Sequence, residues 1–100
     1  MPAVLEIKDL SLCLRGNEKQ ILLEGVTFQL NKGRVLGIVG ESGSGKSLTA
    51  LSIISLLPEN IRIFRGEVLF HEDDKTTSLL LLGNKEIRRY RGRKIGMIFQ

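Results

Sequence analysis

The densest group of residues that could do chemistry is the segment Gly40-Glu41-Ser42-Gly43-Ser44-Gly45-Lys46-Ser47, which fits the pattern G-x-x-x-x-G-K-[ST]. Glycines in such a loop let successive backbone N–H groups turn towards a phosphate, because no Cβ stands in the way. Lys46 adds a positive charge for the β- and γ-phosphates, and Ser47 supplies a hydroxyl ligand for Mg²⁺. The segment therefore predicts a site for a nucleoside triphosphate with Mg²⁺.

The elements that must position this loop are a strand before it and a helix after it. Val35–Val39 is a short, continuous apolar run, which is typical of a strand buried on both faces of a parallel sheet. Lys46–Leu57 has helical periodicity, and Pro58 ends the helix because proline cannot continue its hydrogen-bond ladder. The alternative is a plain Gly/Ser-rich turn between a strand and a helix, but such a turn has no need for a Lys-Ser pair at the helix start.

Two more strands are expected before the phosphate loop. Period-two alternation runs through Val4–Leu14 in two stretches, one with apolar residues at odd positions up to Ile7, the other at even positions from Leu10. A polar stretch with a Gly-Asn turn signal separates it from Ile21–Leu30, which alternates in the same way. Asn31-Lys32-Gly33 is predicted to be a tight turn, because Asn and Gly tolerate positive φ, and so to join two antiparallel strands in a hairpin.

The part of the chain beyond Pro58 predicts shorter elements. They are a strand at Gly66–Phe70, a polar loop at His71–Asp74, a buried strand or loop anchor at Leu79–Leu82, a helix over Lys85–Tyr90 capped by Asn84, and a final apolar strand at Ile95–Phe99.

Composition limits the classes of protein that the chain can represent. Its 100 residues amount to one domain at most, and 42% hydrophobic and 26% charged residues exclude collagen-like, low-complexity and wholly disordered chains. No apolar run approaches the roughly 18–20 residues that cross a bilayer, and no signal peptide is visible, so we expect an intracellular chain that is not embedded in a membrane. The lone Cys13 excludes an internal disulfide and is expected to be buried in a strand.

The net charge of +4 comes from one segment. From Lys85 to Lys94 there are six basic residues and one acidic residue, so the rest of the chain carries a net charge of −1. A solvated basic helix is the simplest interpretation, and contact with a protein partner or anionic lipid headgroups is the next. Nucleic-acid binding is least favoured, because Tyr90 is the only aromatic residue in the segment.

The phosphate loop and the segments around it resemble the ATP-binding subunits of ABC transporters. The stretch from Leu36 to Ser47 is similar to the Walker A segment of that family, and Val26-Thr27-Phe28 and Gly66-Glu67-Val68-Leu69-Phe70 agree with it in order. Arg91–Gln100 resembles the approach to the Q-loop in the dipeptide, oligopeptide and nickel importers, and Leu48–Ser52 also suits that branch. The resemblance covers essentially the whole chain.

This resemblance implies an α/β fold, namely a P-loop NTPase core with an antiparallel β subdomain. Residues 1–100 would be the N-terminal part of a single ABC-type ATP-binding domain, truncated at the Q-loop. The implied nucleotide-binding residues are Gly40, Glu41, Ser42, Gly43, Ser44, Gly45, Lys46, Ser47 and Leu48. Mg²⁺ would lie on Ser47 and on Gln100, the Q-loop residue beside the γ-phosphate, although a surface glutamine is the alternative for Gln100.

Two features depart from the family pattern. Leu14 stands where members usually carry the A-loop aromatic residue that stacks on adenine, so weak base selectivity is expected. Core packing is the alternative role for Leu14, and a shift of one residue in the alignment would place Arg15 there. The Walker B aspartate, catalytic glutamate, signature segment and switch histidine of the family all lie beyond the Q-loop. His71 precedes it and is expected to be a surface residue, so the chain alone is not expected to hydrolyse ATP.

The function that the resemblance implies is coupling of ATP binding and hydrolysis to the import of peptides or nickel. The implied partners are transmembrane permease subunits, a second ATP-binding subunit and an extracytoplasmic solute-binding protein, with no nucleic acid. The implied location is the cytoplasmic face of the inner membrane. A soluble ABC-type or other P-loop NTPase that acts on nucleic acid, and a non-catalytic nucleotide-binding fragment, are the alternatives.

Overall fold

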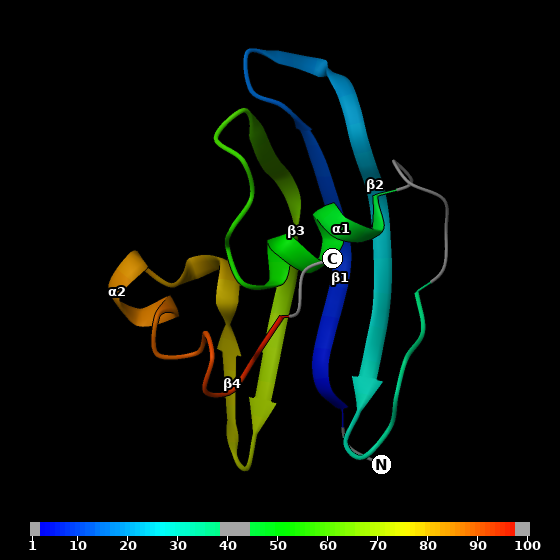
Figure 1. Cartoon of the computed structure of the whole chain (residues 1–100). Helices are drawn as coiled ribbons and strands as arrows, with labels where there is room; N and C mark the ends of the chain where they lie inside the picture. Colours follow the sequence, from blue (N-terminus) through cyan, green and yellow to red (C-terminus); the bar gives the residue numbers. More distant parts are fainter. Residues whose placement is uncertain (1–2, 39–44, 98–100) are drawn as a thin grey trace.

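A four-stranded antiparallel sheet is the main element of the computed structural model, which describes residues 3–38 and 45–97 (Figure 1). The strand order is β2-β1-β3-β4. The strands are β1 (Ala3–Leu14), β2 (Asn17–Asn31), β3 (Ile61–Glu72) and β4 (Lys75–Ser78), and the helical elements are α1 (Lys46–Ile53), the 3₁₀ turn η1 (Leu79–Leu81) and α2 (Asn84–Ile87). The expected antiparallel β subdomain is therefore present.

The two alternating stretches at the N-terminus are one bent strand with a β-bulge at Asp9. Ile7 pairs with Phe28 and Leu10 with Val26, so β1 uses one residue more than β2 between these two pairs. Asp9 has φ +51° and donates its N–H to Thr27 Oγ1 at 2.9 Å. The extra residue reverses the side-chain phase, and this is why Ile7 and Leu10 can both be fully buried.

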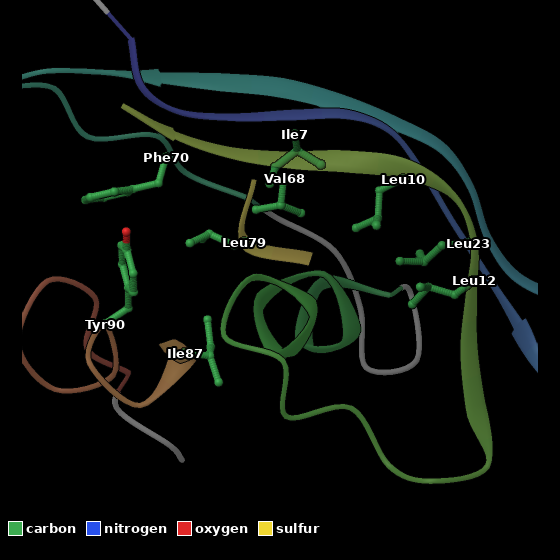
Figure 2. Packing of buried hydrophobic residues seen from close by; sticks show 9 residues of the cluster. All are labelled: Ile7, Leu10, Leu12, Leu23, Val68, Phe70, Leu79, Ile87 and Tyr90. Atoms are coloured by element: carbon green, nitrogen blue, oxygen red, sulfur yellow. The ribbon is translucent and has the colours of Figure 1, made fainter. Parts of the chain in front are cut away.

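The core lies on the side of the sheet where α1 and α2 pack. Figure 2 shows strand side chains pointing towards these helices, and the buried cluster consists of Ile7, Leu10, Leu12, Leu23, Val68, Phe70, Leu79, Ile87 and Tyr90. The rings of Phe70 and Tyr90 meet edge to face, 5.6 Å between centroids, and the Tyr90 hydroxyl donates to Thr77 Oγ1 at 3.2 Å. These contacts hold the segment after α2 against β3 and β4. Cys13 is buried in β1, as predicted.

The hairpin prediction around Asn31 is wrong. The turn itself forms, with the Arg34 N–H donating to the Asn31 carbonyl at 3.1 Å, but no strand follows it at residues 34–38. The hairpin joins β1 to β2 instead, through a two-residue turn in which Gly16 has φ +89°. Val35 is 98% exposed, so the described part of the predicted buried strand Val35–Val39 is an exposed extended segment. All strand pairs among residues 3–38 and 45–97 are antiparallel, and this apolar run therefore has no parallel neighbour to pair with there.

Several other boundaries also differ from the predictions. α1 ends at Ile53 rather than Leu57, because Ser55 adopts φ +57°, which no right-handed helix contains. α2 is a single turn with Gly83 at its N-cap, so Asn84 is the first helical residue and not the cap. In the described part of Ile95–Phe99 there is one isolated bridge between Arg91 and Ile95, and no strand.

Of two predicted loop segments, one is wrong and the other is confirmed in part. His71 is half-buried in β3 and does not lie in a polar loop. Its Nδ1 is hydrogen-bonded to Thr76 Oγ1 at 2.8 Å, and its Nε2 to Glu6 Oε1 at 2.6 Å. Leu79 is fully buried, and half-buried Leu80 and Leu82 also pack against the core, so these three leucines anchor the segment predicted at Leu79–Leu82, whereas Leu81 is 85% exposed.

Candidate functional site

The start of α1 is the part of the phosphate loop that lies within the described residues. Gly45 precedes the helix with φ +97° and ψ 0°, the left-handed conformation that glycine adopts without steric cost. A Cβ on Gly45 would overlap Leu23 Cδ2, so β2 packs directly against the backbone of the loop at this point. Glycine is therefore required here for two reasons: its left-handed conformation, and the lack of space for a Cβ beside Leu23.

The first turn of α1 presents the groups that an anion would bind. Its N–H groups have no acceptor within the helix, and the helix dipole is positive at this end. The side chain of Lys46 is half-buried, Ser47 is exposed, and half-buried Leu48 packs against the core. The arrangement leaves the hydroxyl of Ser47 accessible while Leu48 holds the helix on the sheet.

Two hydroxyl residues that the sequence analysis missed stabilise this turn. Thr49 is buried and donates both its N–H and its Oγ1–H to the Gly45 carbonyl, each at 2.9 Å. Ser52 is fully buried and donates its hydroxyl to the Leu48 carbonyl at 2.7 Å. Each hydroxyl donates to the carbonyl four residues earlier in the chain. A threonine or serine four positions after the last loop glycine is therefore the sequence signal that could have identified Thr49.

The other predicted phosphate-loop residues, Gly40–Ser44, and the predicted Q-loop residue Gln100 lie outside the described residues. Their roles in binding phosphate and Mg²⁺ remain predictions.

Leu14 ends β1 at the hairpin tip. It pairs with Asn17 of β2 and Ile61 of β3, is half-buried, and is not among the side chains packed against the core cluster. Two residues earlier on the same strand, Leu12 pairs with Leu23, the residue that contacts Gly45. Leu14 therefore lies on the strand that runs past the phosphate loop.

Arg15, the alternative A-loop residue, is held by backbone contacts. Its Nε donates to the Glu59 carbonyl at 2.9 Å and its N–H to the Asn60 carbonyl at 2.7 Å. These two bonds tie the β1–β2 turn to the turn before β3. The guanidinium of Arg15 is thus already engaged through its Nε.

The basic segment is not simply a solvated helix. Arg91 is half-buried, and its Nε and Nη2 donate to the carbonyls of Ile54 and Ser55 at 2.8 and 3.0 Å. Because the last carbonyls of a helix receive no N–H donor from within the helix, a cation that donates to them is favourable. Arg91 therefore joins the segment that leads to Gln100 to the far end of the phosphate-loop helix.

Lys94 is also paired. Its Nζ donates to both carboxylate oxygens of Glu72, at 2.7 and 2.9 Å, and lies 4.9 Å from the centre of the Tyr90 ring. The hydrogen bond to Glu72 raises the pKa of Lys94 above its ordinary value of 10.5.

Within residues 3–38 and 45–97, no helix is long and apolar enough to span a bilayer. No three His, Cys, Asp or Glu side chains of this part of the chain are grouped to hold a metal ion.

Comparison with known proteins gives one family and several relatives. A family model described as ABC transporter matches residues 23–100. The oligopeptide transport ATP-binding protein OppD of Bacillus subtilis is 48% identical over 100 residues, which cover 97% of this chain and 26% of OppD. The probable peptide ABC transporter ATP-binding protein y4tR of Sinorhizobium fredii is 46% identical over 99 residues, 97% of this chain and 28% of the relative.

A third relative is the metal-staphylopine import system ATP-binding protein CntD of Staphylococcus aureus, 46% identical over 81 residues, 81% of this chain and 28% of CntD. The chain thus spans about a quarter of the length of the curated relatives it matches.

Proposed function

This chain belongs to the ABC transporter family, and from that membership we propose that the protein is the ATP-binding subunit of an importer that couples ATP binding and hydrolysis to the uptake of peptides. The observation that carries the proposal is the start of α1, where a left-handed Gly45 directly precedes Lys46 and Ser47 at the helix N-terminus, which supports a phosphate site. The names of OppD and y4tR support peptides as the cargo, and that of CntD supports a metal complex as the second candidate, the class to which the predicted nickel cargo belongs.

The residues at the start of α1 fit a nucleotide phosphate. Leu23 takes the space that a Cβ of Gly45 would fill, so the backbone just before α1 lies directly against β2. The first-turn N–H groups and the ammonium of Lys46 provide positive charge, and the exposed hydroxyl of Ser47 suits Mg²⁺, which prefers oxygen ligands. Mg²⁺, when bound, neutralises charge on the phosphates. Lys46 and the α1 N-terminus would bind and orient the β- and γ-phosphates.

The remaining parts of the proposal concern the whole protein. We place it at the cytoplasmic face of the membrane, with transmembrane permease subunits, a second ATP-binding subunit and a solute-binding protein as partners. Gln100 is proposed as the Q-loop residue and Leu14 as the A-loop residue. Nucleic acid is less favoured as a partner, because two cations of the basic segment, Arg91 and Lys94, are engaged within the chain.

The test of the proposal is the exchange of Lys46 for alanine in the full-length protein. Removal of one preorganised donor that stabilises transition-state charge typically costs about 10²–10³ in turnover, so we expect phosphate release from ATP to fall by about that factor. Lys19→Ala, which removes an exposed lysine from β2, is the matched control and should keep the wild-type rate. Wild-type turnover in Lys46→Ala would refute the assignment of this loop.

A further inference from the structure

The free edge of the sheet forms one side of a groove. Among residues 3–38 and 45–97, β4 pairs only with β3 and ends the strand order β2-β1-β3-β4. Residues of β4 and of the segment from Leu81 to Lys94 line a cavity of about 540 Å³. In an antiparallel edge strand, alternate residues direct their N–H and C=O groups away from the sheet. The groove therefore offers an array of backbone donors and acceptors along one wall.

The groove has an excess of positive charge. Lys75, Arg89 and Lys94 line it, and Glu86 is the single acidic residue among the described lining residues. Lys94 is paired with Glu72, whereas the side chains of Lys75 and Arg89 have neither an ion pair nor a hydrogen bond with any other described residue. Two cations that line one groove and have no side-chain partner among the described residues favour a ligand that brings carboxylates.

The end of the groove is apolar. Leu81 is 85% exposed there, the largest exposure of a leucine among the described residues, and Leu82 lies half-buried beside it. The floor is rigid, because Tyr90 is fixed by Phe70 and by its hydrogen bond to Thr77. A ligand with at least one apolar side chain next to its acidic groups would cover Leu81.

We propose that this groove binds an extended acidic segment of a partner protein, which adds to β4 as a fifth strand. The backbone of such a segment pairs with the outer edge of β4, its carboxylates meet Lys75 and Arg89, and an apolar side chain covers Leu81. A membrane surface carries the same charge but cannot enter the groove to reach the β4 backbone, and the phosphates of nucleic acid accept hydrogen bonds without donating any. The inference is independent of the nucleotide site.

A competing explanation is that Lys75 only protects the edge from pairing, as lysines on edge strands commonly do. Protection of the edge requires only the charge of Lys75 on a short strand. It does not explain why Arg89 lies across the groove or why Leu81 is exposed at its end. The two explanations differ in a measurable way, because a protected edge binds no peptide strand.

The test uses a fluorescein-labelled peptide, Glu-Val-Glu-Val-Glu-Val, added to the full-length protein and followed by fluorescence anisotropy in 0.15 M salt. We expect saturable binding, and at least tenfold weaker binding of the isomer Glu-Glu-Glu-Val-Val-Val, in which the charges no longer alternate. A version of the first peptide with N-methylated valines keeps every charge but loses alternate N–H donors, and it should also bind at least tenfold more weakly. Binding that is equal for all three peptides would overturn strand addition.

Variants locate the site. Arg89→Glu should weaken binding of the alternating peptide at least tenfold, whereas Arg88→Glu, the same charge change at an exposed residue that does not line the groove, should change it less than threefold. Circular dichroism of both variants, and an unchanged ATP affinity, separate loss of the groove from loss of the fold. The proposal would be overturned if the two variants had equal effects, or if the wild type did not bind the peptide. It would also be overturned if the protein bound vesicles with 30% phosphatidylglycerol, or polyuridylate, more tightly than the peptide.

Discussion

Replacing Gly66 by alanine should destabilise the protein more than an alanine at Gly16 or Gly83. Gly66 lies opposite the bulge in β1 with φ +114°, and a Cβ there would meet Leu10 Cα at 2.6 Å and the Asp9 oxygen at 2.7 Å. Both are backbone atoms, so neither can rotate away and the two strands must separate. The backbone conformation costs alanine about 1–2 kcal/mol, and overpacking of this kind costs about 1–3 kcal/mol. We expect the free energy of unfolding to fall by about 2–5 kcal/mol.

Two other glycines divide this cost into its parts. Gly16 has φ +89° but open space around its missing Cβ, so Gly16→Ala should lose about 1–2 kcal/mol from conformation alone. Gly83 has φ −74°, and its Cβ would lie 3.7 Å from the nearest atom, Glu86 Oε1, an ordinary contact. Gly83→Ala should therefore stay within about 0.5 kcal/mol of the wild type.

Urea unfolding of the full-length protein, followed by far-ultraviolet circular dichroism, measures all three variants. The predicted order of stability is Gly83→Ala, then Gly16→Ala, then Gly66→Ala as the least stable. If Gly66→Ala is no less stable than Gly16→Ala, the overlap with the β1 backbone at the bulge does not lower the free energy of unfolding, and the prediction is wrong.

Two further predictions concern the nucleotide site and the helix beside it. If Leu14 is the A-loop residue, ATP and GTP should bind with similar affinity, and Leu14→Tyr should tighten ATP binding, because stacking of a base on an aromatic ring is worth about 1–3 kcal/mol. Calorimetric titration of both nucleotides tests this, and a strong ATP preference that the exchange leaves unchanged would contradict the assignment. Arg91→Leu should lower the free energy of unfolding by about 1–3 kcal/mol, since two carbonyls at the end of α1 lose a charged donor. Arg93→Leu, at an exposed neighbour, should have an effect below about 0.5 kcal/mol in the same unfolding assay.

The sequence by itself determined the features that depend on neighbouring residues. The alternation in β1, the burial of Cys13 and the start of α1 just after Gly45 all follow from residue types a few positions apart. The family was also accessible from sequence, because the phosphate-loop motif and the stretch Arg91–Gln100, which together indicate it, are each continuous in the chain. For the same reason the sequence indicated a helix in the right place but not its end, which a left-handed Ser55 decides.

The tertiary structure alone decided everything that depends on a partner distant in the chain. A change of phase in β1 is visible in the sequence, but only the pairing with β2 and β3 shows that it is a bulge, and only the approach of β1 explains Gly66. Arg91 looked like one more solvated cation until the fold brought it to the end of α1, 36 and 37 residues away. The apolar run at Val35 has the composition of a buried strand, yet it is exposed here, because a strand needs a neighbour to pair with and its own residues cannot specify one.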